Sequence, residues 1–234
     1  MSEILSISDM TVRYHDGVEA LRGVCLSLWP HQRVGLIGPN GAGKTSLLLA
    51  IMRGVPFEGD IEIDGMALTR RTAERARSRC GMVFQEADDQ LFMPTLLADV
   101  AFGPLNQGLG SDEAESHARA AIAAVGLAGL DDRSGHHLSG GQKRNAALAT
   151  VLAMRASLLL LDEPGANLDF RSRGRLMELL AGRDEAMLIA THDLDMVRQL
   201  CTRVVLLDNG QVAADGSTDE ILGDTALLSR HDLA

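Results

Sequence analysis

The chain has 234 residues, 46% hydrophobic content and a formal net charge of −10. This size allows one substantial core, or a large domain with a smaller lobe. A uniformly acidic surface repels phosphate backbones, so we expect no nucleic acid as the main partner. The three cysteines, Cys25, Cys80 and Cys201, are far apart and form no C-x-x-C pair. They indicate a reduced, cytosolic compartment and argue against a structural zinc site.

The first part of the chain reads as a series of strands. No basic segment followed by an apolar core is visible at its start, and no apolar run approaches 18 residues, so we expect a chain that is soluble on its own. The predicted strands are Ile4–Ile7, Thr11–Tyr14, Val24–Leu28, Val34–Ile37, a short pair around Ile61–Ile63 that turns at Asp64-Gly65, and Cys80–Phe84.

The stretch 38–45 fits the phosphate-loop pattern G-x-x-x-x-G-K-[ST] between the Val34–Ile37 strand and a predicted helix, Ser46–Met52. Its glycines let backbone N–H groups point inward at phosphate oxygens, and the helix aims its positive end at the same anion. Lys44 is expected to reach the β- and γ-phosphates, and the Thr45 hydroxyl to hold Mg²⁺. A tight strand-to-helix turn with a chance lysine is the weaker alternative. The chain is therefore predicted to bind a nucleotide.

The middle of the chain is predicted to be helical. A cluster of arginines after residue 69, interrupted by Glu74, reads as a solvated helix face. From Asp88 to about Gly135 alanine-rich sequence dominates, and Ala114–Val125 is the clearest helix, with Ser111 as its cap. With the helix that follows, this gives an inserted helical lobe over roughly 88–155.

Helices and strands alternate again after Gly140. The predicted elements are a helix at Gln142–Met154, a strand at Leu158–Leu161, a helix at Arg171–Leu180, a strand at Met187–Ala190, a helix at Leu194–Leu200, a strand at Val204–Leu207 and a short last helix capped by Ser217 and Glu220. Such alternation implies parallel strand pairing. The predicted fold is α/β: one domain over residues 1–234, with a phosphate-loop nucleotidase core, a mostly parallel sheet, an N-terminal antiparallel β subdomain and the helical lobe.

Candidate catalytic residues follow predicted strands. Asp162 and Glu163 end an apolar strand, where a parallel sheet opens onto its ligand crevice. Asp162 is placed to support Mg²⁺ through its water shell, and Glu163, expected to point elsewhere because strand side chains alternate, to act as base for the attacking water. Gln85 is a candidate for the metal or the attacking water, and His192 for the γ-phosphate. In isolation, Gln85 reads as a solvated glutamine and His192 as a structural histidine.

A second anion site is predicted at 138–142, where Ser139 is a plausible cap of a helix whose first N–H groups face outward. With this stretch the chain, over nearly its whole length, resembles the nucleotide-binding subunit of an ABC transporter. The signature elements occur in the family's order. They are the phosphate loop, Gln85, Leu138–Gln142, Asp162-Glu163, Asn167-Leu168-Asp169 and His192.

The resemblance implies a head-to-tail dimer, two copies of this chain or two relatives, with two ATP molecules at its interface. It implies that Ser139 and Gly141 of one subunit close on the γ-phosphate held by Lys44 of the other, that Tyr14 stacks on the adenine and that Asp169 couples the two sites. The ATP contacts it implies are Tyr14, Gly38, Asn40, Gly41, Gly43, Lys44, Thr45, Ser46, Ser139, Gly141 and Gln142. Those for Mg²⁺ are Thr45, Gln85 and Asp162, and the catalytic ones are Glu163, His192 and Gln85.

The stretches 83–92 and 99–104 are similar to those of energy-coupling-factor importers, especially the cobalt type, and so is His136-His137 before the signature. This likeness implies transmembrane coupling and substrate-capture subunits as partners, a peripheral place on the cytoplasmic face of the membrane, and import of cobalt, nickel or a vitamin such as biotin. Adjacent histidine side chains diverge and lack an obvious third ligand, which argues against a metal site there. Phe170 departs from the family, which commonly has proline at that position.

Two alternative activities are supported less well by the sequence. A soluble ABC ATPase acting on DNA or ribosomes fits less well, because the residues between Thr45 and Leu138 show no sustained heptads and the chain carries one cassette. A GTPase lacks its guanine-reading Asn-Lys-x-Asp element here.

Overall fold

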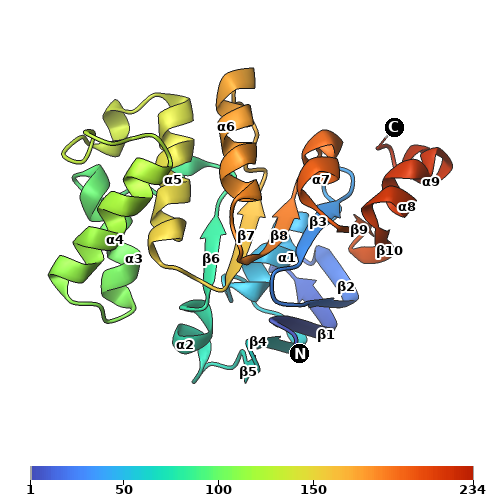
Figure 1. Cartoon of the computed structure of the whole chain (residues 1–234). Helices are drawn as coiled ribbons and strands as arrows, with labels where there is room; N and C mark the ends of the chain where they lie inside the picture. Colours follow the sequence, from blue (N-terminus) through green and yellow to red (C-terminus); the bar gives the residue numbers. More distant parts are fainter. Residues whose placement is uncertain (1, 234) are drawn as a thin grey trace. The chain divides into compact units, whose positions relative to one another are not determined.

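The structure is a computed structural model that describes residues 2–233. Its chain forms two compact units (Figure 1). The first unit comprises the chain up to Cys80, Ser157–Asp162 and the chain from Asp184 onward. The second comprises Gly81–Ala156 and Glu163–Arg183.

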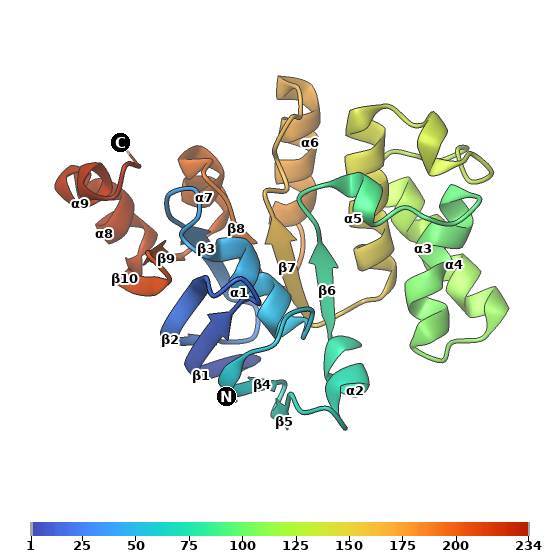
Figure 2. The ribbon, with the colours of Figure 1, turned by 180° about the vertical axis from the view of Figure 1, so that it is seen from behind.

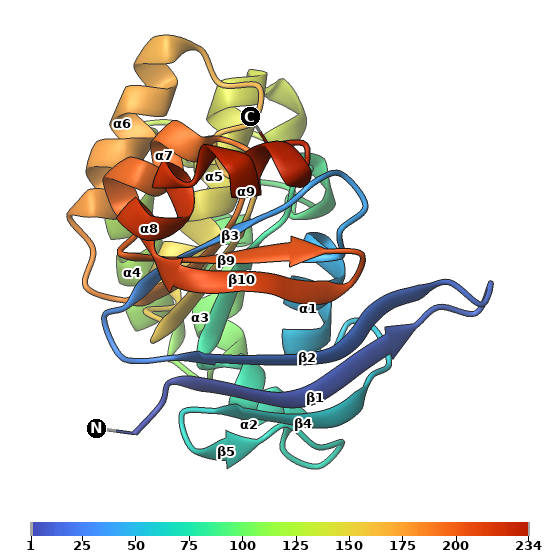
Figure 3. The ribbon, with the colours of Figure 1, turned by 90° about the vertical axis from the view of Figure 1, so that its right-hand side faces the viewer.

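An antiparallel sheet opens the first unit, with strand order β2-β1-β4-β5 (Figure 3). Its strands are β1 (Leu5–Arg13), β2 (Glu19–Leu28), β4 (Glu58–Ile63) and β5 (Met66–Ala67). The prediction of two strands before residue 15 is wrong, because β1 runs through both. The pairing of β1 shifts between Ile7 and Met10, where Asp9 has φ 50°, so a bulge carries one strand through the residues between the two predicted ones.

The second sheet of the first unit is mostly parallel, as predicted, and has the order β10-β9-β3-β8-β7 within this unit. Its strands are β3 (Arg33–Ile37), β7 (Leu158–Asp162), β8 (Ala186–Ala190), β9 (Arg203–Asp208) and β10 (Gln211–Ser217). Strand β3 pairs in parallel with β8 and β9, and β10 runs antiparallel to β9. Strands β7 and β8 are buried along their whole length, which explains their unbroken apolar sequences.

Helices cover this sheet. The helices of the first unit are α1 (Lys44–Ile51), α2 (Ala73–Arg77), α7 (Leu194–Leu200), α8 (Thr218–Gly223) and α9 (Thr225–Arg230). Helix α1 contacts β2 on one side and β7 on the other, and α7 packs on β3. This last contact is close enough that a Cβ at Gly35 would lie 2.6 Å from a methyl group of Val197. Ser217 and Glu220 form the predicted capping box of α8.

The second unit is largely helical. After β6 (Cys80–Val83), which begins at the boundary, its elements are the 3-10 turn η1 (Ala87–Asp89), α3 (Leu96–Asn106), α4 (Ser111–Ala124), the 3-10 turn η2 (Gly135–His137), α5 (Gly140–Ala153) and α6 (Phe170–Ala181). Helices α3, α4 and α5 pack side by side (Figure 2). The N-cap of α4 is Gly110, without a side-chain hydrogen bond, so the expected cap at Ser111 is wrong and Ser111 is the first helical residue.

Within the described part of the chain, no helix combines the length and the apolar character needed to cross a membrane.

Candidate functional site

The phosphate loop connects β3 to α1 and has the backbone shape that its glycines allow. Gly38, Gly41 and Gly43 have φ of 152°, 80° and 107°. A Cβ on Gly38 would meet the carbonyl oxygen of Leu207, and one on Gly43 would lie 2.6 Å from the carbonyl oxygen of Ala20. Both positions therefore require glycine, and the loop keeps a concave backbone surface suited to phosphate oxygens.

Lys44 is the first residue of α1 and folds back over the loop. Its Nζ donates to the carbonyl oxygens of Gly38 at 2.6 Å and Pro39 at 3.0 Å. The N-cap, Gly43, forms no side-chain cap bond, and the first turn of α1 contains no acidic residue. The ammonium group and the outward N–H groups of α1 thus lie together at the loop, where the helix dipole adds further positive potential.

Tyr14 and Ser46 form a second link to α1. The Tyr14 hydroxyl oxygen lies 2.9 Å from Ser46 Oγ, and the tyrosine ring is partly exposed beyond the end of β1. Both residues belong to the first unit, so the structure brings the predicted adenine-stacking residue to the helix that the phosphate loop starts. The stacking on adenine itself stays a prediction.

The β9–β10 turn supports the phosphate loop from the other side. Asn209 and Gly210, with φ of 48° and 75°, form the turn, which matches the Asn-Gly sequence typical of such hairpins. The Gly210 N–H donates to the Ala42 carbonyl at 3.1 Å. Asp208 Oδ1 accepts from Asn209 Nδ2 at 3.1 Å, and Asp208 Oδ2 lies 2.8 Å from Nδ1 of His231.

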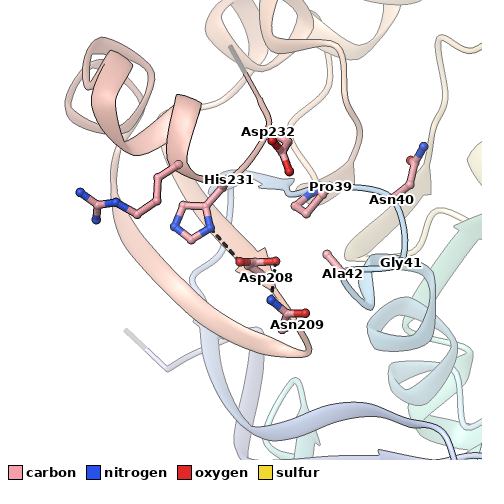
Figure 4. Close-up of a pocket in the computed structure, with 9 residues that line it drawn as sticks. Pro39, Asn40, Gly41, Ala42, Asp208, Asn209, His231 and Asp232 are labelled. Atoms are coloured by element: carbon pink, nitrogen blue, oxygen red, sulfur yellow. Dashed lines mark hydrogen bonds and ion pairs between the residues drawn. The ribbon is translucent and has the colours of Figure 1, made fainter.

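A pocket of about 380 Å³ lies between this turn, the outer side of the phosphate loop and the end of the chain (Figure 4). Its lining residues are Pro39, Asn40, Gly41, Ala42, Asp208, Asn209, Arg230, His231 and Asp232. Neither β10 nor α9 was predicted, so this support was missed. The Asn209-Gly210 dipeptide after an apolar run is the signal that would have revealed the hairpin.

Asp162 ends β7 at the same edge of the sheet as the phosphate loop. Asp162 pairs in register with Ala190, and the Thr191 N–H donates to the Leu36 carbonyl at 3.2 Å. Asp162 is only 2% exposed, whereas Thr45 is exposed. The buried carboxylate of Asp162 and the hydroxyl of the exposed Thr45 are hard oxygen donors, the kind of ligand that Mg²⁺ prefers. These two residues therefore fit the ion. His192 is exposed just after β8.

Glu163 is the first residue of the segment Glu163–Arg183, which belongs to the second unit. It has φ 47°, a left-handed conformation uncommon outside glycine, and its carbonyl accepts from the Ala166 N–H at 3.0 Å. The strand ends at Asp162, so the expected cause of the divergence of the two carboxylates, strand alternation, is wrong. The backbone instead turns sharply at Glu163, directly after the strand. Non-glycine residues in such conformations concentrate at functional sites.

The signature stretch begins α5 in the second unit. Ser139 Oγ accepts from the Gln142 N–H at 3.3 Å, and Gln142 Oε1 accepts from the Ser139 N–H at 2.9 Å. This capping box confirms Ser139 as the N-cap. It leaves the Ser139 hydroxyl hydrogen and the N–H groups of Gly140 and Gly141 as donors for an anion, while the Gln142 side chain is engaged in the cap.

Asp169 is the N-cap of α6. Its two carboxylate oxygens accept from the Ser172 N–H and the Ser172 hydroxyl, each at 2.9 Å. These hydrogen bonds lower the pKa of the Asp169 carboxyl. The next residue, Phe170, is 91% exposed, which is unusual for a phenylalanine in a described helix.

Gln85 is exposed, and the backbone just before it is bound by two side chains, Arg144 and Gln90, that the sequence analysis does not predict. Buried Arg144 donates to the carbonyl oxygens of Phe84 at 3.2 Å and Ala166 at 3.4 Å. Gln90 accepts from the Phe84 N–H at 3.2 Å and donates to Thr150 Oγ1 at 2.6 Å. The backbone before Gln85 is therefore fixed to α5 within the second unit. No local motif marks Arg144, because its partners are backbone carbonyls distant in sequence.

The predicted site residues fall into two groups. The first unit holds Tyr14, the phosphate loop, Ser46, Asp162 and His192, and the second holds Gln85, Ser139, Gly141, Gln142 and Glu163. Among residues 2–233, no group of three or more His, Cys, Asp or Glu side chains is arranged to hold a metal ion, and His136 and His137 are both exposed.

The chain is similar to known proteins over most or all of its length. The family model described as ABC transporter matches residues 21–166. A protein of Gloeobacter violaceus, named only provisionally as an ABC transporter ATP-binding protein, is 47% identical over 100% of this chain and 97% of its own length. The energy-coupling factor transporter ATP-binding protein EcfA of Methanothermobacter thermautotrophicus is 38% identical over 98% of this chain and 76% of its own length.

Two solved structures are similar throughout. CbiO1 from Clostridium perfringens, part of the ABC transporter complex CbiONQ, has a TM-score of 0.83 and 31% identity, covering 100% of this chain and 96% of that one. A dimeric ATP-binding cassette bound to ADP and Pi has a TM-score of 0.83 and 25% identity, covering 92% and 98%. This protein belongs to the ABC transporter ATP-binding family.

Proposed function

We propose that this member of the ABC transporter ATPases is the ATP-hydrolysing subunit of an energy-coupling-factor importer, and that its cargo is a transition-metal ion, cobalt. The observation that carries the proposal is the edge of the sheet where the phosphate loop and Asp162 lie together. Similarity to EcfA over 98% of the chain and to CbiO1 over 100% supports the importer type.

The chemistry assigned to the first unit is binding and charge neutralisation. The phosphate-loop N–H groups and Lys44 bind the β- and γ-phosphates, and Tyr14 stacks on the adenine. Thr45 and Asp162 hold Mg²⁺, which when bound neutralises charge on the transferring phosphoryl group, and a role of Gln85 toward the metal is proposed from the family resemblance alone. Glu163, at a left-handed turn directly after the strand that ends in Asp162, acts as base for the attacking water, while His192 donates to the γ-phosphate.

We further propose that two copies of this chain pair head to tail, with Ser139 and Gly141 of one copy on the γ-phosphate of the other. Three observations support this: the exposed start of α5, the side chain of Phe170 at 91% exposure beside the Asp169 cap, and a dimeric cassette among the similar structures. An exposed aromatic ring of this size is typical of an interface core.

The partner proposed for the second unit is a membrane subunit. Phe92, Phe102 and Leu105 are 63%, 39% and 45% exposed, and the two rings contact edge to face with centroids 5.2 Å apart. Exposed apolar residues that cluster on one face mark interaction sites. A cytoplasmic, peripheral place on the membrane follows from this docking.

The test is ATP-dependent uptake of labelled cobalt in cells that carry the native chain or Glu163→Gln, with nickel and biotin measured in parallel. Cobalt uptake that is lost only in the variant would support the ATPase role and the cargo. Glu163-dependent uptake of nickel or biotin would retain the mechanism and overturn the cobalt assignment. Uptake of all three unchanged by Glu163→Gln would overturn the importer role.

A further inference from the structure

A second pocket of the first unit lies at the end of α1 that is remote from the phosphate loop. Its volume is about 490 Å³, within the range of small-molecule sites. Its lining residues are Arg53, Gly54, Val55, Pro56, Phe57, Leu68 and Arg70. None of these belongs to the phosphate loop or to the other residues assigned to ATP.

Arg53 is held in this pocket by an unusual backbone. It follows α1 with φ 55°, and the N–H groups of Arg53 and Gly54 donate to the carbonyls of Ala50 at 2.9 Å and Leu49 at 2.8 Å. Glycine or asparagine is the usual residue at such a left-handed helix end. Arginine in this conformation strains the backbone. Such strain is typically retained where the side chain has a function.

The Arg53 side chain has a buried nitrogen that lacks a hydrogen-bond partner among the described residues. Its Nε is buried, and no hydrogen-bond partner for it exists among residues 2–233. A buried donor without an acceptor is destabilising, and native structures rarely contain one. Arg53 is among the residues that line the pocket, so a ligand there with phosphate oxygens would offer its guanidinium group acceptors.

The charge of the pocket is opposite to that of the chain as a whole. Among the described residues that line it, Arg53 and Arg70 are the charged ones, and both are cationic. Glu58, which follows Phe57, is directed to Arg13, 3.2 Å away. In a chain with a formal net charge of −10, two guanidinium groups without a lining carboxylate form a local site for an anion.

We infer that this pocket binds the phosphate group of a phosphorylated organic molecule, either a free phosphate ester or a lipid head group. Guanidinium groups bind phosphate through paired N–H donors, and Arg53 and Arg70 both line the pocket. Val55, Phe57 and Leu68 provide an apolar wall for the organic part of the ligand. This site is separate from the ATP site and does not depend on hydrolysis.

The test observes the arginine Nε–H resonances of the ¹⁵N-labelled full chain by NMR while inorganic phosphate, and then phenyl phosphate, is added. The Arg53 resonance is expected to shift and saturate, with phenyl phosphate binding more tightly because of the apolar wall. The resonance of Arg75, which lies outside the pocket lining, is expected to stay in place. Phosphate binding at the phosphate loop is distinguished by the amide resonances of Gly41 and Gly43.

Two variants separate the ligand role from folding. Arg53→Gly removes the guanidinium and relieves the left-handed backbone, so the melting temperature is expected to stay or rise while phenyl phosphate binds about 10-fold more weakly or worse. Arg70→Gln is expected to weaken binding in the same direction. Arg75→Gln is the matched control and should leave binding unchanged.

Vesicles distinguish the two sources of phosphate. Cosedimentation with vesicles containing phosphatidic acid, but not with phosphatidylcholine alone, and its loss in Arg53→Gly would identify a lipid head group. Saturable phenyl phosphate binding without cosedimentation would identify a free phosphate ester. Unchanged binding in Arg53→Gly, or no saturable shift at Arg53 with either phosphate compound, would overturn the inference.

Discussion

The Nδ1 atom of His231 lies 2.8 Å from Oδ2 of Asp208, and this contact joins the end of α9 to the strand beside the phosphate loop. From Asp208 the connection continues through Asn209 and the N–H of Gly210 to the carbonyl of Ala42. The shape of the phosphate loop is therefore supported by residues near the other end of the chain, as Figure 4 shows for the side chains concerned.

We predict that His231→Ala loosens this support and weakens ATP binding. The His231–Asp208 contact is mostly shielded from solvent, with side chains 14% and 24% exposed, so its loss should cost up to about 1 kcal/mol, or about fivefold in ATP affinity. Isothermal titration calorimetry with ATP measures this. Asp232→Asn changes another residue of the same pocket and serves as control. Equal affinities of His231→Ala and the native chain would show that the contact does not support the loop.

Lys44→Ala is expected to weaken ATP binding by about 10- to 100-fold, since a charge-assisted hydrogen bond to phosphate is lost. The fold should persist, because the bonds of Lys44 to Gly38 and Pro39 are local to the loop and join no other element. Affinity for a fluorescent ATP analogue and the far-ultraviolet circular dichroism spectrum provide the two readouts. Undiminished ATP affinity in a folded variant would rule out the assigned role.

Asp99 gives a prediction about pH. This carboxylate is 3% exposed, accepts the N–H groups of Phe92 and Met93 through Oδ1, and has a buried Oδ2 without a hydrogen bond within the described chain. Burial raises its pKa above the ordinary 3.8. Because the folded state then binds the proton more tightly than the unfolded state, the contribution of Asp99 to stability is full below 3.8 and declines as pH rises through the raised pKa.

The comparison with Asp99→Asn isolates that contribution. The difference in free energy of unfolding between the native chain and Asp99→Asn should shift in favour of the variant as pH increases from 3.8, and then level off. Urea unfolding at a series of pH values measures it. A difference that is independent of pH, or that shifts in favour of the native chain, would show that burial does not govern this carboxyl.

Phe170→Asp tests the proposed pairing of two copies. The aromatic ring is removed from the exposed start of α6, whereas an aspartate there is favourable to the helix dipole, so monomer stability should be unchanged. In a Glu163→Gln background, ATP-dependent dimers observed by light scattering should be lost. Arg171→Gln, at the neighbouring exposed position, should retain them. Dimers that persist in Phe170→Asp would show that this face is not the interface.

Local patterns made much of the fold predictable. The phosphate loop, the helix cap at Ser139, the capping box at Ser217, and the apolar strands β7 and β8 are each specified by a few adjacent residues, and the structure confirms them. Strand β10 was missed because its small and polar residues, Gln211–Ser217, lie at the edge of the sheet without an apolar run. The merger of two predicted strands into β1 depends on a bulge at Asp9, which no local sequence pattern marks.

The candidate site was predictable only where its parts follow a motif. Arg144 bonds the Phe84 carbonyl and Gln90 bonds the Thr150 hydroxyl, each 60 positions away, and Arg53 matters because of its backbone angle and its pocket. None of these relations has a local sequence pattern, since each depends on how the chain folds back on itself. The division of the helical part into two segments, Gly81–Ala156 and Glu163–Arg183, is non-local for the same reason.

The most direct test of the ATPase assignment is the hydrolysis rate of Glu163→Gln measured together with its ATP affinity. The amide keeps the shape of the side chain but cannot take a proton from water, so hydrolysis should fall by about 10²–10⁴-fold while ATP affinity stays within a factor of about two. Hydrolysis near the native rate, with binding intact, would contradict the role of Glu163 as the base and the mechanism built on it.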